Sequence, residues 1–228
     1  MKKLLCAILA ICILALAGCG SKKGDTQVDI EYANQPNQES IQGQEPTETE
    51  EQITFVSSNG EVFTVTVNRS EGTCRIDECR SGKSEINVPE EISGCTVVGI
   101  GPNTFSQNLA KKITLPDTVL YIDAYAFNTC DNLEEVYLGT SLEWVGTYLF
   151  SNCPVLKSVT FPETLTHSKG IIFACCFGLE TAYIPASLTE IDMPISTRDL
   201  CPKLVVVTPA GSAAETSAIE NGLPVRSE

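Results

Sequence analysis

The chain has 228 residues, a formal net charge of −14 at pH 7 and a sequence pI near 4.5. This acidic balance argues against nucleic acid as a ligand, because the phosphates would be repelled. His167 is the only histidine, which removes most zinc sites and most catalytic schemes that depend on a positioned base.

Residues 1–18 form a basic and apolar leader. Lys2 and Lys3 precede an apolar run over residues 4–18, which has the length of a signal-peptide core and is shorter than the roughly 18 residues a membrane-spanning helix needs. The leader ends in Leu16-Ala17-Gly18-Cys19, which resembles the bacterial lipobox. The resemblance implies cleavage before Cys19, acylation of its thiol and a mature protein anchored to a membrane outside the cytoplasm. The alternative is an ordinary secretory signal followed by an incidental cysteine.

Residues 19–52 follow as an acidic linker behind the lipidation site. From Gly24 to Gln52 the chain holds eight Asp or Glu, six Gln and no Lys or Arg. Such a segment has too few large apolar groups to offset the entropy cost of ordering. We therefore expect a disordered, self-repelling spacer, with an acidic motif that binds a partner as the alternative.

Residues 53–85 predict an N-terminal β cap. Ile53–Val56 and Glu61–Val67 are rich in β-branched and aromatic residues, and Ser58-Asn59-Gly60 between them is typical of a hairpin turn. A further strand is predicted through Cys74, Arg75 and Ile76. We expect this section to cover the open edge of the structure that follows.

Residues 86–208 contain a repeat of 23 residues. Phe127, Phe150 and Phe173 are separated by this step, and columns of cysteine and leucine follow it as well. A fixed period in this range predicts a solenoid, in which each turn buries its face only against its neighbours. The cysteine and leucine columns are Cys130, Cys153, Cys176, Leu133, Leu156 and Leu179. The inward strand pairs are Ile86/Val88, Ile113/Leu115, Val136/Leu138, Val159/Phe161, Ala182/Ile184 and Val205/Val207.

The repeat weakens toward its C-terminal end, where residues 209–228 predict a cap. Ser168 stands where an inward Ile or Val is expected, and Ser196 stands in the Phe column. Beyond Pro209, Ser212 and Glu215 have the spacing of a capping box, and Gly222 sits where a C-terminal helix stop is expected. We therefore expect a short helix that shields the last rung.

These units resemble the BspA-type leucine-rich repeats of bacterial surface proteins. The shared pattern is an Ile, a small turn, Ala-Phe, a Cys three residues on and a Leu three beyond it, as in residues 119–138. The Gly211–Ala214 segment is also similar to the terminal segment of that family. The resemblance covers residues 86–225 and implies a mostly β, curved solenoid, export, and roles in adhesion or interaction with hosts and other cells. Many members are far longer than the five or six rungs found in this chain.

Eight cysteines fall in the part predicted to fold. Side chains in the repeat column point the same way, so we expect buried thiols there rather than disulfides between rungs. Cys74 and Cys79 flank Asp77-Glu78 and are the better disulfide candidate for an exported protein, while the state of Cys95 and Cys201 is left open. No CxxC motif occurs, so we expect neither a metal nor a cofactor.

A column of charges alternates in sign along the repeat. Stacked side by side, each charge would lie between two opposite charges, and a slip by one rung would bring like charges together. We interpret this column as a device that stabilises the register. Its members are Lys111, Glu134, Lys157, Glu180 and Lys203.

The outward positions of the repeat strands are the candidate ligand-contact face. Tyr137 and Tyr183 supply rigid amphipathic area of the kind found at binding hot spots, although ordinary strand tyrosines are the alternative. Trp144 is predicted to pack within the crossover. The face comprises Lys112, Thr114, Glu135, Tyr137, Ser158, Thr160, Thr181 and Tyr183, with Leu204 and Val206 in the last rung.

Together these features predict a membrane-anchored extracellular module that binds an unidentified extracellular or host protein. The alternative is an envelope lipoprotein that contacts cell wall or a co-secreted partner without adhesion. An enzyme is not expected, since no nucleophile elbow, phosphate loop or dinucleotide fingerprint is present and adjacent carboxylates such as Glu134-Glu135 point to opposite faces of a strand. Membrane contact is predicted only through the lipid anchor. The ligand, the oligomeric state and the number of envelope membranes are left open.

Overall fold

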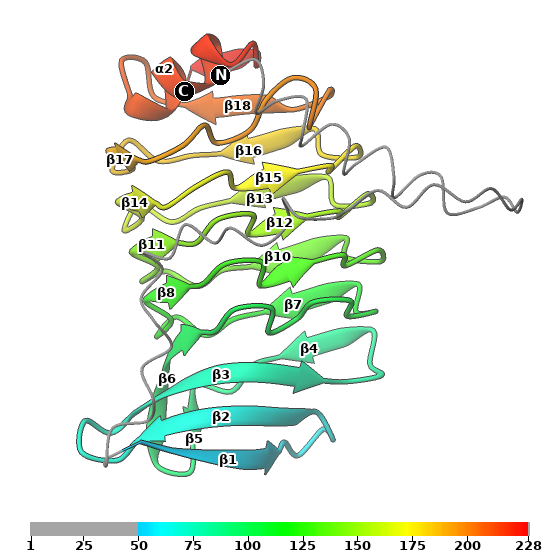
Figure 1. Cartoon of the computed structure of the whole chain (residues 1–228), viewed down its shortest axis with the longest axis vertical. Coiled ribbons are helices and arrows are strands. Elements are labelled where there is room, and N and C mark those ends of the chain that lie inside the picture. Colours follow the sequence, from blue (N-terminus) through cyan, green and yellow to red (C-terminus); the bar gives the residue numbers. More distant parts are fainter. Residues whose placement is uncertain (1–49, 228) are drawn as a thin grey trace, which may run out of the picture. The chain divides into compact units, whose positions relative to one another are not determined.

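The computed structural model describes residues 50–227 as a mostly β solenoid with a β cap at one end and a short helix at the other (Figure 1). The predicted signal peptide, Cys19 and the acidic linker up to residue 49 lie outside the described residues. Among residues 50–227 no helix has the length and apolar character needed to cross a bilayer. The fold class predicted from the repeat is confirmed.

The cap is an antiparallel meander of three strands, β1 (Glu50–Val56), β2 (Val62–Asn68) and β3 (Thr73–Arg80). Strand β1 begins three residues before the predicted start, because residues 50–52 continue the pairing with β2 without a shift. The predicted hairpin turn is present, with Gly60 at φ +86° and its N–H donating to the Ser57 carbonyl at 3.0 Å. Strand β3 then pairs in parallel with β6 (Cys95–Ile100), which joins the cap to the solenoid.

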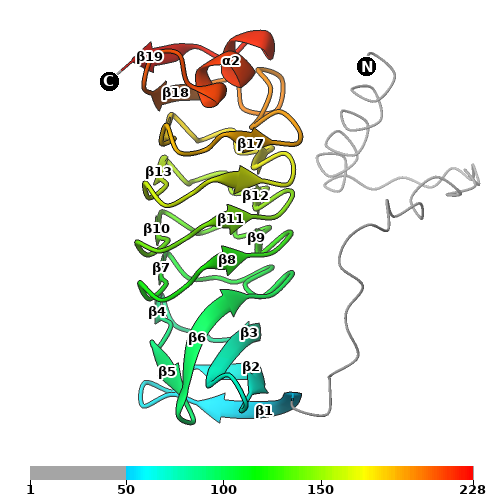
Figure 2. The ribbon, with the colours of Figure 1, turned by 90° about the vertical axis from the view of Figure 1, so that its left-hand side faces the viewer.

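The solenoid carries parallel ladders on three sides, one rung above another (Figure 2). The crossover ladder continues the cap sheet from β6 through β8 (Tyr121–Ile122), β11 (Trp144–Val145), β14 (His167–Ser168) and β17 (Glu190–Ile191), with β5 (Glu91–Ile92) paired to β6. The inner ladder holds β9 (Phe127–Asn128), β12 (Phe150–Ser151) and β15 (Phe173–Ala174). The strand face holds β4 (Glu85–Asn87), β7 (Lys112–Thr114), β10 (Glu135–Tyr137), β13 (Ser158–Thr160), β16 (Thr181–Tyr183), β18 (Val205–Thr208) and β19 (Val225–Ser227).

A stack of phenylalanine rings forms the centre of the core. Phe127, Phe150 and Phe173 are fully buried, and the centroid of the Phe150 ring lies 5.0 Å from that of Phe127 and 5.7 Å from that of Phe173. Phe105 extends the stack one rung toward the N-terminus at 5.3 Å. At the other end Ser196 closes it by donating its hydroxyl to the Phe173 carbonyl at 2.9 Å. The predicted Phe column is therefore the core.

The cysteine column lies beside the phenylalanine stack and is buried, as predicted. Each thiol donates to the carbonyl of a phenylalanine in the preceding rung. The distances are 3.1 Å from Cys130 to Phe105, 3.0 Å from Cys153 to Phe127 and 3.5 Å from Cys176 to Phe150. The thiols thus satisfy backbone acceptors at the inner ladder while adding apolar volume.

The candidate disulfide between Cys74 and Cys79 is not formed, and both thiols are free and buried. Both residues belong to β3, where five residues of extended chain span about 16 Å, far beyond the Cα separation a disulfide permits. The sequence around Asp77 was interpreted as a turn but is strand. Burial raises the pKa of Cys79 to about 12 and that of Cys74 to about 11, so both thiols stay protonated at neutral pH. Cys95 and Cys201 are also free and buried.

The last rung departs from the predicted register. Thr181 pairs with Val205, a step of 24 residues instead of 23, and Val206 lies opposite Ala182. A slip of one residue turns every side chain of a strand to the other face. Leu204 and Val206, predicted to point outward, are therefore fully buried, and Val205, predicted to point inward, is only half-buried. Val207, opposite Tyr183, is still buried as predicted.

Helix α2 (Ala213–Glu220) covers the C-terminal end, as predicted. The Ser212 hydroxyl accepts a hydrogen bond from the Glu215 N–H at 3.1 Å, and the Glu215 carboxylate accepts one from the Gly211 N–H at 2.5 Å. Gly222 ends the helix with φ +73°. The chain then returns as β19, which adds a parallel strand to β18.

The Phe150 ring is expected to carry much of the stability of the core. Phe150→Ala removes a fully buried ring with an aromatic neighbour on each face, so it should lower the free energy of unfolding by about 3–5 kcal/mol in urea titrations. Phe177→Ala is the matched control, since that ring is 40% exposed and its loss should cost under about 1 kcal/mol. Equal losses in the two variants would contradict the stack as the centre of the core.

Candidate interaction surfaces

The eight residues of the predicted ligand-contact face lie on the outer side of the strand face, but on two separate sheets. Strands β4, β7 and β10 form one sheet, and β13, β16, β18 and β19 form another. Lys112, Thr114, Glu135 and Tyr137 belong to the first sheet, and Ser158, Thr160, Thr181 and Tyr183 to the second. Thr114, Thr181 and Tyr183 are half-buried and the other five are exposed. The structure thus brings these residues together in two groups of four.

The break between the two sheets coincides with a local change in the backbone after β10. Gly139 stands where neighbouring repeats have proline, and it adopts φ +77°. A Cβ there would come within 2.5 Å of the Pro116 carbonyl oxygen, so only glycine fits. In the same rung Val136 is only half-buried, whereas Ile113 and Val159 are buried.

On the first sheet, charged side chains line a shallow hollow, and a tyrosine held by a hydrogen bond lies on the same strand as one of them. The Lys112 ammonium lies 3.0 Å from the Glu135 carboxylate, and the Tyr137 hydroxyl donates to Asp117 at 2.8 Å. That hydrogen bond to a carboxylate raises the pKa of Tyr137 and holds a ring that is still 45% exposed. The hollow is lined by Ser84, Glu85, Lys111, Lys112, Glu134 and Glu135.

The predicted charge column exists as two separate ion pairs. Lys111 lies 3.0 Å from Glu134, and Lys157 lies 3.6 Å from Glu180. Glu134 and Lys157 flank the break between β10 and β13, and no ion pair joins them within the part of the chain that the structure describes. Lys203 is not a member, because the shifted last rung places Leu204 level with Glu180. The prediction of a continuous five-charge ladder is therefore wrong.

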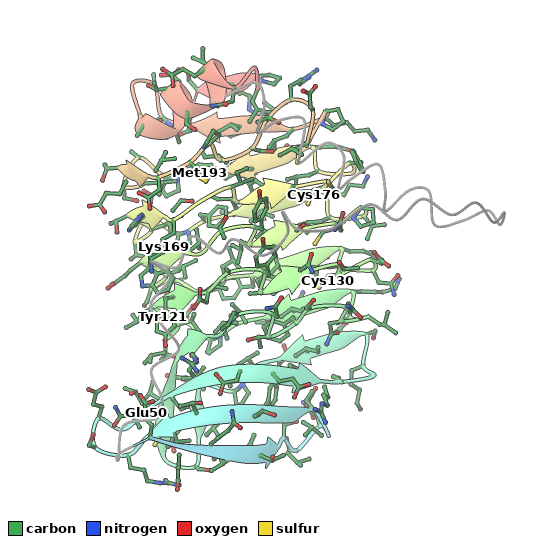
Figure 3. The ribbon with its side chains drawn as sticks, in the orientation of Figure 1. Glu50, Tyr121, Cys130, Lys169, Cys176 and Met193 are labelled. Atoms are coloured by element: carbon green, nitrogen blue, oxygen red, sulfur yellow. The ribbon has the colours of Figure 1, made fainter. Side chains whose placement is uncertain are left out.

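The crossover ladder carries an aromatic stack that sequence analysis missed. The rings of Tyr121 and Trp144 are parallel within 5°, with centroids 5.0 Å apart, and the Lys169 ammonium lies 3.6 Å from the centroid of the Trp144 ring. Figure 3 shows Tyr121 and Lys169 on the same side of the solenoid. Both residues and Trp144 are half-buried. Trp144 therefore lies in the crossover and packs there, as predicted, but on its outer side.

The Tyr121 ring rests on Gly99 of the preceding rung. A Cβ at Gly99 would lie 2.2 Å from the Cζ atom of Tyr121, so the ring occupies the space that any other residue would fill. Burial raises the pKa of the Tyr121 hydroxyl, and Arg75, paired with Asp77 at 2.6 Å, lies near it. Gly99, Tyr121, Trp144 and Lys169 thus form one continuous stack along the solenoid.

A second aromatic pair lies four residues further along each of the two rungs. Tyr125 and Tyr148 stack with centroids 5.3 Å apart, and both adopt left-handed backbone angles, φ +60° and +52°. We refer to the two stacked pairs, Tyr121 with Trp144 and Tyr125 with Tyr148, as the aromatic cluster. They include the only tryptophan and three of the six tyrosines of the chain. The signal in the sequence was the 23-residue step from Tyr121 to Trp144 and from Tyr125 to Tyr148.

His167 lies between two carboxylates. Its Nδ1 atom is 3.5 Å from Glu190 and its Nε2 atom is 3.1 Å from Asp192. Both ring nitrogens thus face carboxylates, and this arrangement holds the ring in place. Across residues 50–227 no three His, Cys, Asp or Glu side chains are grouped to bind a metal ion.

Stacked rungs with columns of leucine and phenylalanine define a leucine-rich-repeat solenoid, a fold that is typically a non-catalytic scaffold for binding. The pattern described as "BspA type Leucine rich repeat region" matches residues 82–195 in six copies. The chain belongs to this family of BspA-type leucine-rich-repeat proteins. The comparison with curated proteins finds no match.

Solved structures of bacterial leucine-rich-repeat proteins share the fold. The T. pallidum leucine-rich-repeat protein TpLRR superposes with a TM-score of 0.59 and 23% identity, over 64% of this chain and 68% of that one. A leucine-rich-repeat protein from Bacteroides ovatus ATCC 8483 gives 0.52 and 25%, over 64% of this chain and 39% of that one. These similarities support the fold.

The stack on the crossover ladder can be tested through its glycine. Gly99→Ala should displace the Tyr121 ring, change the fluorescence emission of Trp144, which is the only tryptophan, and lower the free energy of unfolding by about 1–3 kcal/mol. Gly82→Ala is the matched control, because a Cβ there meets no atom within 4 Å. Identical emission spectra for both variants and the unaltered chain would show that the Tyr121 ring is not confined by Gly99.

Proposed function

We propose that the chain is a protein-binding module held at a membrane surface outside the cytoplasm, and that it recognises its partner through the strand face. The observation that carries the proposal is the exposed outer side of the first sheet. There Tyr137, fixed by Asp117, stands beside an ordered pair of opposite charges. Hot spots at protein interfaces are enriched in such rigid aromatic side chains.

The sequence before the solenoid supports the location. A basic and apolar leader ending in Cys19 supports lipid attachment, and the acidic segment behind it supports a spacer between the anchor and the binding module. The sequence from Ile53 to Glu228 is also acidic, with 21 acidic and 11 basic residues. Such a surface does not bind an anionic bilayer by itself, so the tether sets the distance from the membrane.

The proposed binding surface can be tested with the full chain, purified in mild detergent, against extracellular-matrix proteins, host cells and isolated cell wall. A protein ligand that engages the strand face should bind the Tyr137→Ala/Tyr183→Ala variant at least about tenfold more weakly, since two aromatic contacts are lost. The matched control is Tyr125→Ala, which removes a ring that is 37% exposed on a different face. Titration by surface plasmon resonance gives the dissociation constants.

Two outcomes would contradict the proposal. Unchanged affinity after loss of Tyr137 and Tyr183, together with weaker binding after Tyr125→Ala, would move the binding surface to the aromatic cluster. Retention on isolated cell wall without any protein ligand would favour the alternative role, an envelope lipoprotein without adhesive function.

A further inference from the structure

The two ends of the solenoid are covered differently. At the C-terminal end, helix α2 packs against β17 and β18, and β19 adds a further strand. At the N-terminal end, β1 pairs with β2 alone among the described residues, and it is the outermost strand of its sheet (Figure 1). The backbone N–H and C=O groups along the outer edge of β1 therefore have no strand to pair with in this part of the chain.

Strand β1 lacks the features that usually protect such an edge. All seven residues pair with β2 in unbroken register, without a bulge. The strand contains no proline and no lysine, and its only charges are Glu50 and Glu51 at the beginning. From Gln52 to Val56 the edge is unbroken and uncharged, which makes it a template for another strand.

The apolar face of the cap also continues as far as this edge. Phe63 and Val65 on β2 are fully buried, whereas Phe55 and Ile53, which pair with them, are only half-buried. The difference arises because β2 has a strand on both sides and β1 has one on a single side. A further strand beside β1 would bury these two side chains.

We infer that the occupant of this edge is β1 of a second copy, paired antiparallel. In that orientation Glu50 and Glu51 of one copy lie beside the Val56 end of the other, so no like charges meet. A parallel pairing would place both glutamates beside their counterparts and is disfavoured. Arg69 further offsets the charge of Glu51, at 2.5 Å from its carboxylate.

The symmetry of the pairing fits the distribution of apolar side chains. A two-fold axis perpendicular to the sheet pairs the same strand with itself, which is the usual form of a homodimer interface. It also keeps Ile53 and Phe55 of both copies on one side of the joined sheet. With Val56 opposite Glu50, Ile53 lies opposite its counterpart and Phe55 lies opposite Glu51 of the other copy, so the two apolar faces meet at Ile53.

The experiment is sedimentation of the full chain in mild detergent over a range of concentrations, which should show a two-chain species. Val56 is 59% exposed, so its substitution leaves the fold of the cap intact, as unchanged thermal unfolding would verify. Val56→Glu places a second carboxylate beside Glu50 at both ends of the interface and should raise the dissociation constant about tenfold or more. Val56→Lys at the same position should leave it unchanged or lower it, because lysine faces Glu50.

Two further variants complete the test. Glu50→Lys combined with Val56→Glu should restore the association, and Ile219→Glu, at a residue 61% exposed on helix α2, should leave it unaltered. A single-chain species at every concentration would overturn the proposal. Equal weakening by Val56→Glu and Val56→Lys would overturn the antiparallel arrangement, because a parallel pair brings Val56 against Val56.

Discussion

Each turn of this solenoid can bury its apolar side chains only against the turns next to it, so the alignment of successive turns is the constraint on which the rest of the structure depends. Backbone hydrogen bonds between rungs fix that alignment, for example from the Phe127 N–H to the Leu149 carbonyl at 3.0 Å. The phenylalanine stack adds to it, since rings about one rung apart pack face to face. The cysteine column uses carbonyls of the same rungs, and so the core and the ladders reinforce each other.

The same alignment gives the outer faces their different characters. On the strand face it brings residues of opposite charge level with each other, as at Lys112 and Glu135. On the crossover ladder it places Tyr121 against Trp144. Gly99 lies against the other face of the Tyr121 ring, and the Lys169 ammonium lies over the Trp144 ring. In a repeat with a fixed step, equivalent positions of successive rungs lie side by side. Similar residues at such a position in two rungs are therefore enough to form a surface of one chemical kind.

Much of the fold could be predicted from the sequence, because its signals are local or strictly periodic. The 23-residue step located Phe150 and Cys153 in the core, and turn chemistry located the first hairpin and helix α2. The structure differs from the prediction where the pairing of strands in different rungs determines the register or the length of a strand. The shift at Val206 comes from a step of 24 residues that only the register with β16 reveals, and β3 continues through a segment whose composition suggested a turn.

The candidate sites were harder to predict for a related reason. Strands of two residues, such as β11, are too short to show an alternating pattern, so the outward position of Trp144 could be inferred only from its 23-residue step to Tyr121. The tyrosines of the strand face were placed outward correctly, but the sequence did not show that they are divided between two sheets at the level of Gly139.

That division also has a mechanical meaning. The crossover ladder and the inner ladder run unbroken past the level of β10 and β13, since β11 pairs with β14 and β12 with β15. Only the strand face lacks hydrogen bonds there. The strand face is therefore the least restrained side of the solenoid at this level, so a bend here would open or close that face. A ligand long enough to contact both sheets would bind best at one angle between them, and its binding would stabilise that curvature of the solenoid.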